Sequence, residues 1–157
     1  MAGKTNAMRM LDRAKIPYTQ HSYDVSDGLI DGVSVAHKTG QNPDQVFKTL
    51  VTSSGSQLYV FVVPVAKELD LKKAAREAGE KRVEMIHVKD ILKFTGYIRG
   101  GCSPIGMKKL YPTLIDQSAQ MFDTILVSGG QKGLQIEVSP LDLAQLIDAK
   151  FAELTVE

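Results

Sequence analysis

Residues 47–65 read FKTLVTSSGSQLYVFVVPV, and the rest of the chain is best understood outward from this stretch. Two runs rich in β-branched and aromatic residues, Phe47 to Thr52 and Leu58 to Val65, flank Ser-Ser-Gly-Ser at positions 53–56. Such runs favour strands, and a short link containing glycine favours a hairpin. The sequence therefore predicts an antiparallel strand pair at the core of a sheet.

One charged residue, Lys48, interrupts the first run. Because side chains alternate along a strand, Lys48 shares one face with Leu50. The opposite face carries Phe47, Thr49 and Val51. A lysine in such a strand lies either at a sheet edge or in a cleft where it meets an anion.

A second informative stretch, Gly96 to Gly106, reads GYIRGGCSPIG and predicts a shaped loop, because glycine and proline disfavour regular structure. Paired glycines such as Gly100 and Gly101 let a ligand approach bare backbone, and their N–H groups can face an anion or a developing oxyanion. A tight connection between two elements has the same composition, so both interpretations stay open.

The remaining elements alternate irregularly between helices and strands. Glycine and aspartate at 24–32 predict a loop, and Asn42-Pro43 begins a helical turn. Helices are expected over 6–16, 33–39, 71–78 and 88–95, with a last one opened by Ser139-Pro140; further strands are expected over 18–23, 113–115, 124–127 and 134–138. Hairpins mixed with helices, without a βαβ repeat, predict one α+β domain over residues 1–157, with a mixed or mainly antiparallel sheet.

Composition and charge narrow the class of protein. With 43% hydrophobic and 24% charged residues, no long apolar run and a single cysteine, the chain is expected to act in the cytoplasm, away from membranes. The net charge of +1 hides an asymmetry, since residues 67–109 hold 11 Lys or Arg against 6 Asp or Glu, and residues 116–157 hold 2 against 7. A basic middle third suits either a solvated helix face or contact with a polyanion.

Other chemical motifs are weak. His21, His37 and His87 have no partners at metal-ligand spacing, so no metal is expected, and no cofactor motif is present. Cys102 has no histidine or carboxylate near it in sequence to activate its thiol. Ser103 does not sit in a Gly-x-Ser-x-Gly elbow, whereas the glycine-rich residues 129–133 form a hairpin turn that could hold a phosphate.

Taken together, the motifs resemble the YbaK/EbsC family of trans-editing aminoacyl-tRNA deacylases, the Cys-tRNA(Pro) deacylases. The similarity runs from about Lys4 to Leu154 and rests on motifs in a fixed order: VFKTL at 46–50, LDLKKAA at 69–75, VEM at 83–85, TGY at 95–97, GGCSPIG at 100–106 and VSGG at 127–130.

The resemblance implies a curved mixed sheet flanked by helices, and it implies roles for particular residues. By position, Lys48 and Gly100 are expected to be catalytic and to line one cleft, with the 128–133 turn at its rim. The residues expected to bind substrate are Tyr23, Thr49, Gly101, Ser103, Ser128, Gly129, Gly130 and Gln135. The implied partners are the acceptor end of tRNA(Pro) and, transiently, prolyl-tRNA synthetase.

The family mechanism uses the substrate's own thiol, which attacks its ester carbonyl and leaves a cyclic thiolactone. Two departures from the family pattern, Asp31 before Gly32 and Gln135 in place of an aspartate, flank the expected pocket and bear on amino-acid preference. Two rivals therefore stay open: a deacylase for Ala- or another aminoacyl-tRNA(Pro) that uses water, and a non-catalytic module that binds tRNA or synthetase.

Overall fold

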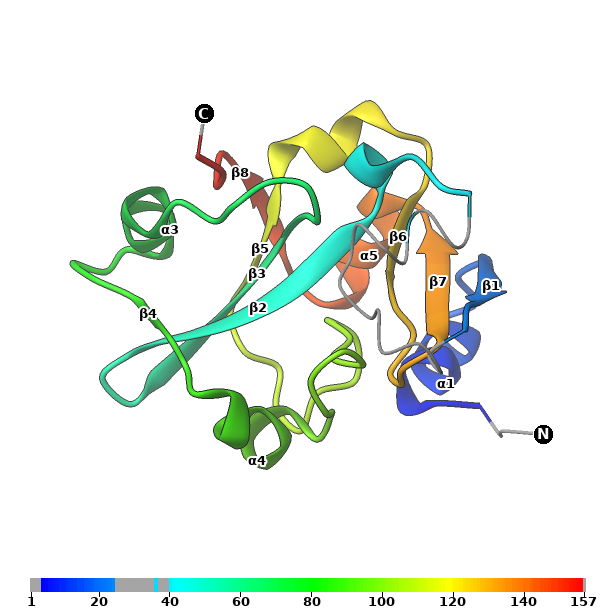
Figure 1. The fold of residues 1–157 in the computed structure, drawn as a ribbon, viewed down its shortest axis with the longest axis horizontal. Coiled ribbons are helices and arrows are strands. Elements are labelled where there is room, and N and C mark those ends of the chain that lie inside the picture. The colour runs from blue at the N-terminus through cyan, green and yellow to red at the C-terminus, as the bar shows by residue number, and fades with distance from the viewer. Residues whose placement is uncertain (1–3, 25–35, 37–39, 157) are drawn as a thin grey trace.

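The computed structural model describes residues 4–24, 36 and 40–156, whose strands form two sheets (Figure 1). The strands are β1 Tyr18–Ser22, β2 Phe47–Ser54, β3 Gln57–Pro64, β4 Glu84–Met85, β5 Thr113–Asp116, β6 Ile125–Ser128, β7 Leu134–Val138 and β8 Lys150–Ala152. The larger sheet has the order β4-β2-β3-β5-β8 and the smaller β1-β7-β6. Only β5 pairs in parallel within these sheets, with β3 and β8, so the predicted α+β class with mainly antiparallel pairing is confirmed.

Short helices with local capping signals flank the strands. They are α1 Asn6–Arg13, α3 Leu71–Ala78, α4 Ile91–Thr95 and α5 Pro140–Leu146, with 3-10 turns η1 Pro43–Gln45, η2 Val88–Asp90 and η3 Gln117–Met121. The Asp70 carboxylate caps α3 by accepting the N–H groups of Lys72 and Lys73, and Gly79 ends this helix with φ 76°. None of the helices in the described part of the chain is long and apolar enough to cross a membrane.

The β2–β3 hairpin has the alternation that its sequence predicts. The two strands are in register from Phe47 opposite Pro64 to Ser54 opposite Gln57. On one face, Leu50 packs against a cluster that includes alanines of α3; on the other, Phe47 belongs to a core shared with α1 and α5. Helices therefore cover both faces of the hairpin.

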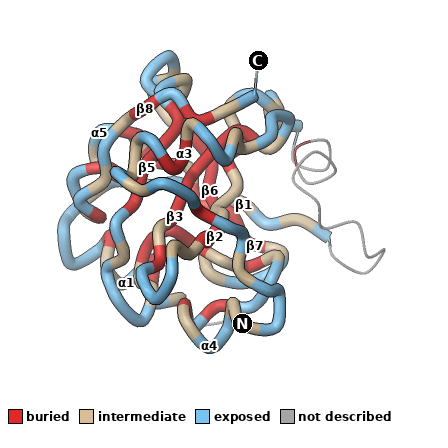
Figure 2. The backbone as a smooth tube through the Cα atoms, turned by 90° about the vertical axis from the view of Figure 1, so that its left-hand side faces the viewer, coloured by how far each residue is buried: buried red, intermediate tan, exposed pale blue. Residues whose placement is uncertain are grey.

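The main core draws on both sheets. Strands β3 and β5 contribute Val62 and Ile115, and strands β6 and β7 contribute Val127 and Ile136. These side chains are all fully buried, and the centre of the molecule in Figure 2 is correspondingly occupied by buried backbone segments. The sheets touch directly at one isolated parallel bridge between Val46 and Leu126.

Some boundaries differ from the sequence-based expectations. Helix α1 ends at Arg13 rather than near residue 16, because Lys15 adopts a left-handed φ of 58° before Pro17. Strands β4 and β8 and the turn η3 are too short to give a periodic signal. The loop expected over 24–32 and the helix expected over 33–39 lie outside the described residues, apart from Asp24 and Ala36.

Candidate active site

A cleft opens where β2 and β6 separate. Val46, which directly precedes β2, forms a parallel bridge with Leu126 of β6, and the two strands then diverge (Figure 1). Further along β2, the next described strand on that edge is β4, which pairs first with Thr52. Between these two points the edge of β2 borders the cleft, so residues from both faces of the strand reach it.

The cleft has a volume of about 140 Å³, and most of its lining was anticipated. The residues that line it are Tyr23, Val46, Phe47, Lys48, Thr49, Val65, Gly100, Cys102, Ser128 and Gln135. Thus Lys48 and Gly100, 52 positions apart in the sequence, share one site. Of the other residues expected to bind substrate, Gly101, Ser103, Gly129 and Gly130 are not among its lining residues.

Lys48 brings a positive charge to one side of the cleft. It is half-buried, and burial lowers the pKa of its ammonium, an effect opposed by the charge of Glu68. Lys48 lies on the same face of β2 as Val46, whose partner Leu126 shares a face of β6 with Ser128. The face of β2 that carries Lys48 is therefore continuous with the face of β6 that carries Ser128, in the smaller sheet.

The glycine loop reaches the cleft through a tight turn. Gly101 N–H donates to the Ile98 carbonyl at 3.0 Å, and Gly100, inside this turn, has φ 86°. A left-handed φ at this position favours glycine. The two glycine N–H groups therefore do not both face a ligand, because that of Gly101 closes the turn.

Gly101 and Ser103 have structural roles in this loop. A Cβ on Gly101 would lie 2.8 Å from Gln131 Cα, so the loop backbone packs directly against the β6–β7 turn. Ser103 is fully buried, and its Oγ accepts the N–H of Ile105 at 3.2 Å. The Tyr97 hydroxyl donates to the Ile105 carbonyl at 2.6 Å and fixes the far side of the loop.

Close packing also accounts for the two glycines after Ser128. A Cβ on Gly129 would lie 2.7 Å from Leu134 Cγ, and Gly130 has φ 106° with Tyr97 Cε1 at 3.1 Å from a Cβ built on it. Ser128 Oγ accepts the N–H of Gly130 at 3.2 Å. The turn therefore needs glycine for its own geometry, and only Ser128 of this motif lines the cleft.

Cys102 lines the cleft but lacks the environment of a nucleophile. Burial raises the pKa of its thiol to about 11, against a smaller lowering by a hydrogen bond from the Thr95 side chain. The thiol is therefore protonated near neutral pH, whereas catalytic thiols have lowered pKa values. Cys102 also packs against Val51 and Val60, which is a structural role.

Two polar atoms in the cleft wall have no partner. Among the described residues, Thr49 Oγ1 and Gln135 Oε1 are the buried side-chain oxygens or nitrogens without a hydrogen bond. Leaving such an atom unsatisfied costs about 1–3 kcal/mol, and both atoms lie in the wall of one cleft, where a bound water or ligand can supply a partner. Sequence reasoning missed the apolar part of the cleft wall, which is formed by Val46, Phe47 and Val65. The sequence signal that could have identified these residues is their position at the open end of the hairpin, near Lys48.

A larger groove lies elsewhere and has a different character. It has a volume of about 520 Å³ and runs past Tyr111, Thr113 and Ile147. None of the residues predicted to act on substrate lines it, and neither unpartnered buried atom belongs to it. Among the described residues, no three His, Cys, Asp or Glu side chains are grouped to hold a metal.

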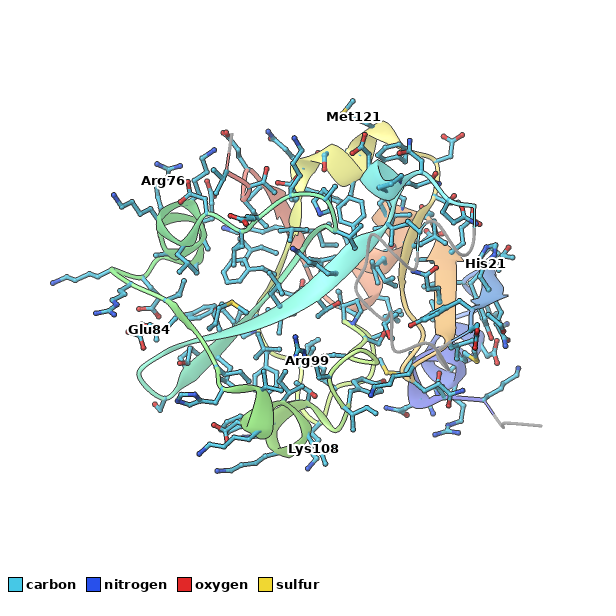
Figure 3. The ribbon with its side chains drawn as sticks, viewed as in Figure 1. His21, Arg76, Glu84, Arg99, Lys108 and Met121 are labelled. Carbon is cyan, nitrogen blue, oxygen red and sulfur yellow. The ribbon has the colours of Figure 1, made fainter. Side chains whose placement is uncertain are left out.

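The basic middle third is divided between two regions of the molecule. In the view of Figure 3, Arg76 on α3 lies on one side of β2, and Arg99 and Lys108 lie on the other side, toward α4. Arg99 directly precedes Gly100 and is exposed. The basic group beside α4 is therefore the one that adjoins the cleft.

Known proteins match this chain over most of its length. Residues 31–146 match the family model described as "Aminoacyl-tRNA editing domain". A relative from Enterococcus faecalis, named "Putative Cys-tRNA(Pro)/Cys-tRNA(Cys) deacylase EbsC", is 46% identical over 155 residues, covering 98% of this chain and 94% of the relative.

Two solved structures share the fold at low identity. One, described as a "putative trans-editing enzyme for prolyl tRNA synthetase", matches with a TM-score of 0.83 and 22% identity, covering 99% of this chain and 100% of that one. The other, "hypothetical protein APE2540", has a TM-score of 0.88 at 19% identity, covering 97% and 100%. By its sequence match over residues 31–146 and its near full-length relative, the chain belongs to the aminoacyl-tRNA editing domain family, in its YbaK/EbsC group.

Proposed function

We propose that this protein is a trans-editing deacylase that removes cysteine from mischarged Cys-tRNA(Pro). The observation that carries the proposal is the cleft between β2 and β6, which combines Lys48, Gly100 and two unpartnered polar atoms. The relative named for Cys-tRNA(Pro) and Cys-tRNA(Cys) supports this substrate class. With this substrate, the proposed site of action is the cytoplasm, where tRNA is aminoacylated, and the proposed transient partner is prolyl-tRNA synthetase.

In the proposed reaction the substrate supplies the nucleophile. Its thiol loses a proton and its sulfur attacks the ester carbonyl; the ester C–O bond then breaks, the tRNA hydroxyl leaves with a proton, and a cyclic thiolactone forms. Cys102, the one thiol of the chain, has a raised pKa and is not required for this step. A cysteine thiol has a pKa near 8.5 and ionises far more readily than a serine alcohol, so chemistry favours Cys-tRNA over Ser-tRNA.

The protein's part is to orient the ester and to stabilise charge. Orientation of reacting groups contributes about 7–11 kcal/mol in favourable cases, and one oxyanion donor about 3–4 kcal/mol. The Gly100 backbone and the Lys48 ammonium are the proposed sources of oxyanion and phosphate stabilisation. The cleft volume of about 140 Å³ is large enough for a small aminoacyl group.

The test is to assay deacylation of Cys-, Ala- and Ser-tRNA(Pro) in parallel, with mass spectrometry of the released product. The proposal predicts rapid clearance of Cys-tRNA(Pro) alone, with thiolactone as the first product. Clearance of Ala-tRNA(Pro) as free alanine would favour the water-dependent rival. Absence of clearance with all three substrates, in the presence of prolyl-tRNA synthetase, would favour the non-catalytic rival.

A further inference from the structure

Gln135 is the most deeply buried polar side chain in the cleft wall. It is 5% exposed and lies in β7, opposite Ser128 of β6 on one side and His21 of β1 on the other. Its Oε1 has no hydrogen-bond partner among the residues that the structure describes. A buried amide oxygen without a partner is unfavourable unless a ligand supplies the donor.

Glu137, the next polar residue on the same face of β7, shows that on this face the lack of a hydrogen-bond partner is confined to Gln135. Glu137, two residues along β7, accepts a hydrogen bond from Thr124 Oγ1 at 2.6 Å and contacts His21 Nε2 at 2.8 Å. These bonds lower the pKa of the Glu137 carboxyl, that of Thr124 having the larger effect. The Glu137 carboxylate therefore has hydrogen-bond partners in Thr124 and His21, whereas the amide oxygen of Gln135, at the cleft, has none among the described residues.

The cleft also has two chemically different ends. Lys48 on β2 offers a cation, whereas Gln135 on β7 offers an acceptor, and β6 with Ser128 lies between these strands. Neighbouring strands in a sheet lie about 4.8 Å apart, and β2 and β6 diverge here, so the backbones that carry Lys48 and Gln135 are separated by more than one strand spacing. An aminoacyl ester carries both complementary groups, an amine that donates and a carbonyl oxygen that accepts, and can therefore interact with Gln135 and Lys48 at once.

We infer that Gln135 Oε1 accepts a hydrogen bond from the α-amino group of the aminoacyl ester, so that Gln135 is a substrate-binding residue that recognises the amine. The inference rests on the proposed deacylase function. The amine is the polar group of the ester that donates strongly, since the carbonyl and ester oxygens only accept and a thiol donates weakly. Anchoring the amine beside β7 turns the carbonyl toward Gly100 and Lys48.

The test compares two inert ligands with and without the amine. They are 3′-amino-3′-deoxyadenosine acylated through an amide by cysteine, and the same nucleoside acylated by 3-mercaptopropionate, which keeps the thiol and lacks the amine. Kd is measured by calorimetry for the wild type, for Gln135→Met and for Gln20→Met, an exposed glutamine of β1 that serves as control. Deacylation of Cys-tRNA(Pro) by the wild type is measured alongside.

The expected result is selective. Gln135→Met weakens binding of the cysteinyl ligand about tenfold or more, as for a hydrogen bond to a charged group, and changes binding of the mercaptopropionyl ligand less than twofold. Thermal stability is retained, because replacing an unpaired buried amide by an apolar side chain of similar shape is close to neutral. Gln20→Met leaves both affinities unchanged.

Two results overturn the inference. Equal weakening of both ligands would show that Gln135 only shapes the cleft, and equal affinity of the wild type for both ligands would show that the amine is not read. If either result is obtained and the wild type still clears Cys-tRNA(Pro), the inference about Gln135 fails and the proposed function stands. If the wild type neither clears Cys-tRNA(Pro) nor binds either ligand, the proposed function fails and the inference with it.

Discussion

Two threonines of β2 lie three residues apart and have opposite surroundings. Thr52 is fully buried, and its Oγ1 donates to the Tyr59 carbonyl of β3 at 3.1 Å. Thr49 also has a buried Oγ1, but that atom has no partner among the described residues. At Thr52 the strand has β3 on one edge and β4 on the other, whereas at Thr49 the second edge borders the cleft.

The contrast shows how this fold makes a site from ordinary elements. In the part of β2 that is paired on both edges, the Thr52 hydroxyl finds its acceptor on β3. Where β2 separates from β6, polar groups are buried by the surrounding elements without receiving partners. A substrate that binds there gains hydrogen bonds that the free protein lacks.

The largest effect is expected for Lys48→Met, which removes the charge of the cleft and keeps the apolar stem. We expect kcat/KM for Cys-tRNA(Pro) to fall about 100-fold, equivalent to about 2.7 kcal/mol of transition-state stabilisation. Tm should stay within about 2 °C, because burial already disfavours the ammonium, as its lowered pKa indicates. Lys72→Met, on the exposed part of α3, should change neither quantity.

The same variant has a distinct pH signature. Because burial lowers the pKa of Lys48 from 10.5, its ammonium is lost as pH rises through that lowered value. Activity that depends on this charge should therefore decline at a pH below 10.5 in the wild type, and the Lys48→Met profile should lack that step. A folded Lys48→Met protein with wild-type activity would contradict the assignment.

A smaller loss is expected for Gly100→Ala. Gly100 and Gly55 both have left-handed φ values, 86° and 62°, so alanine strains the backbone by about 1–2 kcal/mol at either position. Only Gly100 lines the cleft, and a shifted turn there should lower kcat about tenfold. Gly55→Ala, in the β2–β3 turn with open space around it, should lose comparable stability and keep its activity. Equal activities would show that the loop backbone takes no part in catalysis.

A moderate effect is expected on tRNA affinity. If the protein contacts two or three phosphates, the logarithm of its association constant for tRNA should fall with the logarithm of the salt concentration, with a slope of about −2 to −3. Arg99→Gln, next to the cleft, should reduce the magnitude of this slope by about one, whereas Arg76→Gln on α3 should not. A flat salt response of the wild type would instead favour a protein or free amino-acid ligand.

The smallest effect is expected for Cys102→Ala. The thiol is protonated near neutral pH, since burial raises its pKa to about 11, and the substrate supplies its own thiol. We expect kcat/KM to change less than threefold and stability to fall by about 1 kcal/mol from lost packing. A loss of more than about 2 kcal/mol of transition-state stabilisation would restore Cys102 as a nucleophile.

Local sequence signals were sufficient for the scaffold. The alternation of Phe47 to Thr52 and the helix over 71–78 depend on neighbours within a few residues, and the structure has both as predicted. The glycine at position 100 also has a local cause, because a tight turn with a left-handed φ favours glycine. Such features can be read from one chain because the physical cause and the residue lie close together in sequence.

The cleft itself could not be derived in this way. Its walls come from β2 and β6, which are about 80 positions apart, and the point where they diverge depends on tertiary packing. For the same reason composition did not distinguish Gly100, which lines the cleft, from Gly101, which packs on Gln131. Ser103 also gave no local sign that it is fully buried.

The most direct test of the cleft between β2 and β6 as the active site is backbone amide NMR of the wild type, titrated with the amide-linked cysteinyl adenosine ligand. The largest shift changes are expected at Thr49, Gly100, Ser128 and Gln135, which line that cleft. Changes confined to 111–114 and 147–150, in the larger groove, would contradict it.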